Sequence, residues 1–156
     1  MLPFAFDLLF DDSIKFVSLI GKAGSGKTLM AIASGMEQTL SLSQNNNKYT
    51  KIVVSRPVQP LGKDIGFLPG DMKEKMMPWL KPIGDNIEHI TSGEEGNIMA
   101  YYMDQGKLEV EALSYIRGRS ISNAFVIIDE AQNLTAHEVK TIITRIGENT
   151  KIVLTG

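Results

Sequence analysis

The sequence predicts an α/β fold, with an open and mostly parallel sheet and helices on both of its faces. Two observations favour this fold. Short apolar runs alternate along the chain with segments of helical period, and a complete strand, helix and strand can be followed from residue 124 to residue 155. Because parallel strands are joined by right-handed crossovers, any ligand is expected at the carboxyl ends of the strands.

Five apolar runs are predicted to be strands. Residues 16–20 form a continuous apolar run between Lys15 and Gly21, which is typical of a central strand buried on both faces. The other four predicted strands are residues 51–55, 108–113, 124–128 and 151–155.

Helices are predicted from helix-forming residues and capping signals. Residues 27–40 are rich in Ala, Leu and Met. Further on, Thr135 and Glu138 form a capping box that begins a helix, and Gly147 stands where a left-handed residue would end it. The buried stripe of this second helix is expected to be Val139, Ile142, Ile143 and Ile146.

The region between Arg56 and Gly106 is less regular. Its five prolines exclude one long helix, because each proline removes an amide donor, and short helices joined by turns are expected instead. A helical spacing relates Met76, Leu80, Ile83 and Ile87, in a segment that Pro78 and Pro82 divide or bend.

Size and composition limit the class of protein. With 156 residues, 43% of them hydrophobic and 22% charged, the chain suits one domain over residues 1–156. The formal net charge of -2 gives no overall attraction to nucleic acid. No run approaches the roughly 20 apolar residues of a membrane span, so we expect no membrane partner and a cytoplasmic location. The absence of cysteine excludes disulfides and a cysteine nucleophile.

The most specific motif is a phosphate loop. The segment Gly21-Lys22-Ala23-Gly24-Ser25-Gly26-Lys27-Thr28 fits G-x-x-x-x-G-K-[ST] between a predicted strand and a predicted helix. Glycines let backbone amides close around phosphate oxygens, Lys27 is expected to bridge the β- and γ-phosphates, and the Thr28 hydroxyl suits Mg²⁺. A dinucleotide fingerprint is excluded because Leu29 replaces its third glycine. The loop predicts binding of ATP with Mg²⁺.

An acidic pair follows the strand at residues 124–128. Asp129 is expected to hold Mg²⁺, usually through water, and Glu130 to orient or deprotonate the water that attacks the γ-phosphate. Alone, such a pair is most often a helix-capping surface, but the phosphate loop reverses those odds. A water-activating acid favours an ATPase over a kinase. The two histidines, His89 and His137, lack ligand-spaced partners and are assigned to surface or helix-cap roles.

Further segments carry a resemblance to a known family. They are Ser55-Arg56-Pro57, Asp64-Ile65-Gly66-Phe67-Leu68-Pro69-Gly70, Pro78-Trp79-Leu80, Tyr115-Ile116-Arg117-Gly118-Arg119 and Asp129-Glu130-Ala131-Gln132-Asn133. With them the chain closely resembles the PhoH family of ATPases over nearly its whole length. It is most similar to the form in which a PIN ribonuclease domain precedes the PhoH domain.

The resemblance implies a RecA-like P-loop NTPase core related to superfamily 1 helicases. It also implies a homo-oligomer, a hexameric ring, and ATP hydrolysis coupled to single-stranded RNA beside a PIN ribonuclease domain in the parent chain. By the same resemblance, Gln132 senses nucleotide state and Arg56 follows a strand like the helicase segment that meets nucleic acid. Arg117 and Arg119 contact phosphate or act across a subunit interface, the alternative being exposed charges or surface salt bridges.

Aromatic residues around this region are assigned to the core rather than to base stacking, namely Phe67, Trp79, Tyr101 and Tyr102. Two family features are missing: a glutamine-bearing turn after residues 151–155, and an adenine-contacting glutamine before a helix at residues 4–9. The sequence is therefore interpreted as a fragment truncated at both ends, with weak hydrolysis of its own. Two alternatives stay open: a nucleotide-gated oligomeric binding module without unwinding activity, and a small-molecule phosphotransferase, which Glu130 disfavours.

Overall fold

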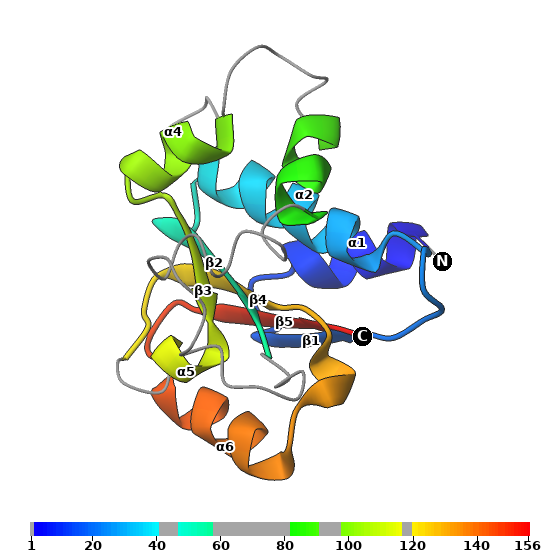
Figure 1. Ribbon diagram of the computed structural model, residues 1–156, viewed down its shortest axis with the longest axis vertical. Coiled ribbons are helices and arrows are strands. Elements are labelled where there is room, and N and C mark those ends of the chain that lie inside the picture. Colours follow the sequence, from blue (N-terminus) through cyan, green and yellow to red (C-terminus); the bar gives the residue numbers. More distant parts are fainter. Residues whose placement is uncertain (1, 41–46, 58–81, 91–97, 117–119) are drawn as a thin grey trace, which may run out of the picture.

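The computed structural model describes residues 2–40, 47–57, 82–90, 98–116 and 120–156. These residues form a five-stranded, all-parallel sheet in the order β1-β5-β4-β2-β3, which confirms the predicted α/β fold (Figure 1). The strands are β1 (Phe16–Leu19), β2 (Lys51–Arg56), β3 (Leu108–Ala112), β4 (Ala124–Ile128) and β5 (Lys151–Thr155).

Helices cover both faces of this sheet. They are α1 (Leu2–Phe10), α2 (Lys27–Leu40), α4 (Ile98–Asp104), α5 (Leu113–Ile116), η3 (Ala131–Asn133) and α6 (Ala136–Arg145), with a further helix over residues 82–90. In Figure 1 the helices α1, α2 and α4 and the green helix at residues 82–90 lie on one face, and α5 and α6 lie on the other. Among the helices that the structure describes, none is both long and apolar enough to cross a membrane.

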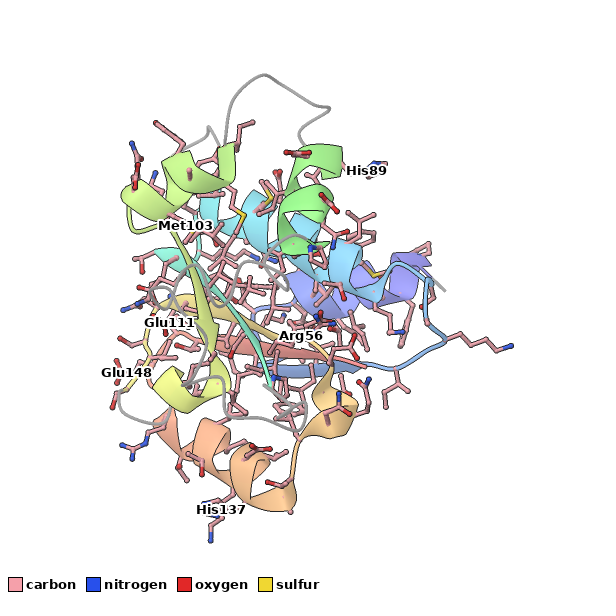
Figure 2. All side chains as sticks on the ribbon, in the orientation of Figure 1. Arg56, His89, Met103, Glu111, His137 and Glu148 are labelled. Carbon is pink, nitrogen blue, oxygen red and sulfur yellow. The ribbon has the colours of Figure 1, made fainter. Side chains whose placement is uncertain are left out.

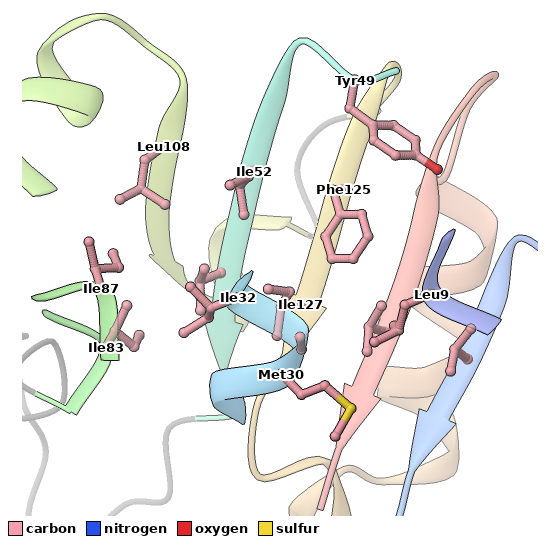
Figure 3. Close-up of a cluster of buried hydrophobic side chains, with 14 residues drawn as sticks. Leu9, Met30, Ile32, Tyr49, Ile52, Ile83, Ile87, Leu108, Phe125 and Ile127 are labelled. Atoms are coloured by element: carbon pink, nitrogen blue, oxygen red, sulfur yellow. The ribbon is translucent and has the colours of Figure 1, made fainter. Parts of the chain in front are cut away.

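The central strand β4 shows how the sequence builds two cores. Side chains alternate across a strand, so Phe125 and Ile127 join the cluster under α2 while Val126 and Ile128 join the cluster over α6. All five β4 residues are buried, as a continuous apolar run between two helical layers requires. Figure 3 shows the first cluster, in which the rings of Tyr49 and Phe125 pack edge to face with their centroids 5.6 Å apart.

The edge strand β1 departs from its prediction. Residues 16–20 were expected to be a central strand buried on both faces, but β1 lies at the edge of the described sheet, beside β5. Val17 is buried, whereas Phe16 is 45% exposed and Ile20 is 86% exposed. An apolar run indicates a strand, but the order of strands decides which faces are covered.

The C-terminal end of α1 is held by four donors, of which three lie far away in sequence. The last carbonyls of a helix have no partner within the helix and need one from elsewhere. The donors to the carbonyls of residues 7–10 are, in chain order, the amide of Asp11, the amine of Lys151, the side-chain amide of Gln38 and the amine of Lys48. Helix α1 is therefore fixed to α2, to the approach to β2 and to β5.

The start of α6 is as predicted, but its buried stripe is narrower than predicted. Both hydrogen bonds of the capping box between Thr135 and Glu138 are present. Of the predicted stripe, Ile142 is buried but Ile143 is 52% exposed, because α6 lies at the surface and covers the sheet with a narrower face.

Gly147 does not adopt the predicted left-handed conformation. The chain leaves α6 in an extended conformation at Ile146, which forms a bridge with Ile121, so no left-handed residue is needed. The space around it is tight instead, since a Cβ atom there would lie 3.2 Å from the Ile121 carbonyl oxygen and from Ser122 Cβ.

Much of the region with five prolines lies outside the described residues, including Phe67, Met76, Trp79 and Leu80. Its described part agrees with the prediction of short helices. Pro82 begins the helix over residues 82–90, where its missing amide costs nothing, and Ile83 and Ile87 are buried. Tyr102 packs against the first core cluster, but Tyr101 is 57% exposed, so its assignment to the core is wrong.

The contact between α2 and β4 gives a first prediction. A Cβ atom on Gly35 would lie 2.8 Å from Cδ1 of the fully buried Phe125. We expect Gly35→Ala to lower the free energy of unfolding in urea by about 1–3 kcal/mol, because overpacking outweighs the gain of ~1 kcal/mol in helix propensity. The matched control is Gly84→Ala, whose added carbon would have its nearest contact at 3.5 Å and should not destabilise the protein. Equal stability of both variants would contradict this packing.

The buried amine of Lys151 gives a second prediction. Burial lowers its pKa from 10.5 to about 8. Between about pH 8 and 10.5 the unfolded chain therefore binds more protons than the folded one, so this amine makes stability rise with pH, whereas below pH 8 its contribution is constant. Urea unfolding at several pH values should show this rise in the wild type relative to Lys151→Met. Burial raises the pKa of Tyr49, which also titrates at high pH, but its contribution to stability is the same in both proteins and cancels in the difference. If the free energy of unfolding changes with pH in the same way in both proteins, the pKa of Lys151 is not lowered.

Candidate functional site

Residues 21–28 connect the end of β1 to the start of α2 as a tight loop. Gly24 and Gly26 have φ angles of 78° and 82°, which favour glycine, and added Cβ atoms there would meet nothing within 4 Å. The amide of Gly21 donates to the carbonyl of Gly156 at 3.2 Å, so the loop is tied to the end of β5. Exposed backbone amides at the start of a helix of this length suit an anion.

The amine of Lys27 lies over this loop. It donates to the carbonyl oxygens of Gly21 at 2.6 Å and Lys22 at 2.9 Å, and it lies 3.4 Å from the hydroxyl of Ser25. The loop thus holds a cation at its centre, where phosphate oxygens would be attracted both by the amine and by the helix dipole.

Asp129 joins the phosphate loop to the two strands beside it. Its Oδ1 atom accepts a hydrogen bond from the Thr28 hydroxyl at 2.9 Å and another from the Thr155 hydroxyl at 2.8 Å. Thr28 and Asp129 are 101 positions apart in the chain, so the sheet has brought the two predicted metal ligands into contact. An all-oxygen pair of this kind matches the preference of Mg²⁺, which takes few protein ligands and keeps several waters.

Glu130 is held by two neighbouring side chains. Arg56 donates from Nη2 to its Oε1 atom at 2.8 Å, and Gln132 donates from Nε2 to its Oε2 atom at 2.5 Å. These hydrogen bonds, that from Arg56 first, keep the pKa of Glu130 below its ordinary value. Its carboxyl is therefore ionised at neutral pH.

An open cavity of about 430 Å³ unites these groups. Its lining comprises most of the phosphate loop (Gly21 and Ala23 to Thr28), the acidic turn (Asp129, Glu130 and Gln132) and three further residues (Leu29, Asn86 and Gly156). The cavity lies where the β1, β4 and β5 strands end, which is the location expected for a ligand of a parallel sheet.

The structure brings most of the predicted site residues together. The loop residues, Asp129, Glu130 and Gln132 surround or support one cavity, whereas Arg117 and Arg119 lie outside the described residues. Both histidines are exposed, and Figure 2 shows His89 and His137 on well-separated helices. In the described ranges, no three acidic or histidine side chains form a separate metal cluster.

The contributions of four residues to this site were not predicted from the sequence. Thr155 and Gly156 follow from the end of a predicted strand, where a hydroxyl and a glycine are a usable signal. Asn86 has no sequence signal, because only the folded chain places the helix over residues 82–90 beside the loop. The guanidinium of Arg56 lies against the acidic pair, a contact that the sequence did not predict.

Gly156 lies close against the turn that follows β4. A Cβ atom there would lie 2.6 Å from Gln132 Oε1 and 3.1 Å from the Gln132 amide nitrogen. This close approach brings the end of β5 against the turn that carries the acidic pair.

Comparison with known proteins identifies the family of this chain. Residues 6–156 match the protein family described as "PhoH-like protein". The chain is 54% identical over 153 residues to "Protein PhoH2" of Bacillus subtilis (strain 168), covering 97% of this chain and 34% of that relative. It is 42% identical over 152 residues to "Protein PhoH2" of Thermobispora bispora, with coverages of 97% and 33%.

A third relative is more distant. The "PhoH-like protein" of Synechocystis sp. is 39% identical over 137 residues, which cover 88% of this chain and 39% of the relative. The chain therefore spans between 33% and 39% of the length of these relatives. Since the family match extends over nearly the whole chain and the fold is that of a P-loop NTPase, the chain belongs to the PhoH-like protein family.

Proposed function

We propose that this chain binds ATP with Mg²⁺ and hydrolyses it, and that the intact protein couples hydrolysis to remodelling of single-stranded RNA. The observation that carries the proposal is the contact of Thr28 with Asp129 at the edge of a cavity that Glu130 also lines. A phosphate loop, an oxygen-rich cation site and an ionised carboxylate thus share one cavity. Because Glu130 can orient a water as the nucleophile, hydrolysis needs no acceptor hydroxyl of the kind that a kinase requires.

The residues of the chain would divide the reaction among them. Loop amides and the Lys27 amine bind the β- and γ-phosphates, and Thr28 and Asp129 hold the cation. Mg²⁺, when bound, neutralises charge on the phosphate oxygens. Glu130 orients a water and accepts its proton as the water oxygen bonds to the γ-phosphorus. The bond to the bridging oxygen breaks, and ADP and phosphate leave.

The RNA-linked part of the proposal concerns the whole protein. It rests on the resemblance to PIN-linked PhoH ATPases, including the hexameric ring, the PIN ribonuclease domain and roles for Arg117 and Arg119. The described surface adds one supporting feature, which is that the acidic turn reaches from the cavity to Arg56 at the end of the neighbouring strand β2. A movement of Glu130 on loss of the γ-phosphate would therefore act directly on Arg56 and on the end of β2.

The third prediction separates binding from turnover. We expect Lys27→Ala to abolish ATP binding, because the loop loses its central cation, and Glu130→Gln to keep binding but lower phosphate release by about 10²–10⁴-fold. Isothermal titration with ATP and Mg²⁺ measures the first effect, and a phosphate-release assay the second. Lys140→Ala on the exposed side of α6 is the control for loss of a lysine charge. ATP binding by Lys27→Ala at wild-type affinity would sink the assignment.

The fourth prediction concerns Thr155. Its hydroxyl fixes the orientation of Asp129, so we expect Thr155→Val to raise the Mg²⁺ concentration for half-maximal ATP hydrolysis several-fold, and Thr155→Ser to stay near the wild type. Valine keeps the volume of the buried side chain but lacks the donor. The measurement is a titration of turnover with MgCl₂ at saturating ATP. Identical titrations for valine and serine would show that the hydroxyl does not set cation affinity.

A further inference from the structure

Arg56 lies at the end of β2, directly beside the acidic turn. Strand β2 pairs with β4 so that Ser55 is opposite Ile128, and the amide of Asp129 donates to the Ser55 carbonyl at 2.8 Å. This register places the next residue of each strand, Arg56 and Asp129, at the same level.

The guanidinium of Arg56 bridges the two carboxylates. Its Nη2 donates to Glu130 at 2.8 Å, and its Nε lies 3.8 Å from Oδ2 of Asp129. The Arg56 and Asp129 side chains are 28% and 15% exposed, so water screens their contact less than it would at an open surface, whereas Glu130 is 37% exposed and its contact is more fully screened. Without the arginine, two neighbouring carboxylates would repel each other at the entrance of the cavity.

The two donors to Glu130 fix its carboxylate without using all of its acceptor capacity. A carboxylate offers about four lone-pair positions, and Arg56 and Gln132 use one on each oxygen. A water can therefore still be accepted. The backbone of Glu130 has φ 54° and ψ 39°, a left-handed conformation that costs a non-glycine residue about 1–2 kcal/mol and that surrounding contacts must maintain.

Arg56 itself does not line the cavity, whereas Glu130 and Gln132 do. It therefore reaches the bound nucleotide through Glu130. We infer that Arg56 is a positioning residue for ATP hydrolysis, whose guanidinium holds the Glu130 carboxylate in the one orientation that aligns the attacking water. This inference rests on the proposed ATP hydrolysis and assigns Arg56 a role in turnover instead of RNA contact.

The fifth prediction tests this role in the intact protein. We expect Arg56→Met to lower kcat for ATP hydrolysis by roughly 10–100-fold, since a misplaced catalytic group costs about that much, while the Kd for ATP with Mg²⁺ changes less than about threefold. Arg56→Lys should fall between, because it keeps the charge but loses the planar fork. Arg145→Met, which removes an exposed arginine at the end of α6, is the matched control and should keep both constants.

A second measurement tests the contact independently of turnover. Urea unfolding of Arg56→Met, Glu130→Gln and the double variant should give a smaller midpoint loss for the double variant than the sum of the two single losses. Additive losses would overturn the contact. An unchanged or raised kcat in Arg56→Met, or an equal loss in Kd, would overturn the positioning role. A loss of RNA affinity in Arg56→Met with an unchanged rate of ATP hydrolysis would also overturn the positioning role.

The proposed function has a separate failure. If Glu130→Gln hydrolyses ATP as fast as the wild type, the reaction does not use this carboxylate. The proposed mechanism would then be wrong, and the role of Arg56 would fall with it, whatever the unfolding data show about their contact.

Discussion

The carboxylate of Asp129 is the point on which the candidate site depends. Its Oδ1 atom accepts hydroxyl hydrogen bonds from the start of α2 and from the end of β5, while its own backbone continues β4. Hydrogen bonds to charged groups contribute about 1.5–3 kcal/mol each, so this one side chain holds three neighbouring segments in register. The phosphate loop is positioned by the sheet and not by its own sequence alone.

The parts of the fold that could be predicted are those that local chemistry determines. Strands β4 and β5 and helix α2 have the boundaries that apolar period and helix formers indicated, and the capping box at Thr135 has both of its hydrogen bonds. These features depend on residues within a few positions of one another. The phosphate loop belongs to the same class, because its glycines and its lysine act within eight residues.

The features that could not be predicted depend on residues that are distant in sequence. The apolar run of β1 gave no sign that it would lie at an edge, since strand order is a property of the whole sheet. The donors that cap α1 include Gln38 and Lys151, which are 29 and 143 positions from their acceptors. Arg56 was recognisable as a motif residue, but its partner Glu130 lies 74 positions away. No local pattern encodes such a distance.

The edge position of β1 has a consequence for how the chain matures. In the described sheet β1 pairs with β5, with Phe16 opposite Ile152, so β1 cannot form this pairing until all the residues between them have been synthesised. At about 5–20 residues per second, the intervening stretch takes on the order of 10 s to synthesise. During that time the backbone of β1 lacks its strand partner and the phosphate loop lacks its anchor at Gly156. The conformation of the phosphate loop is therefore complete only after β5 has paired with β1.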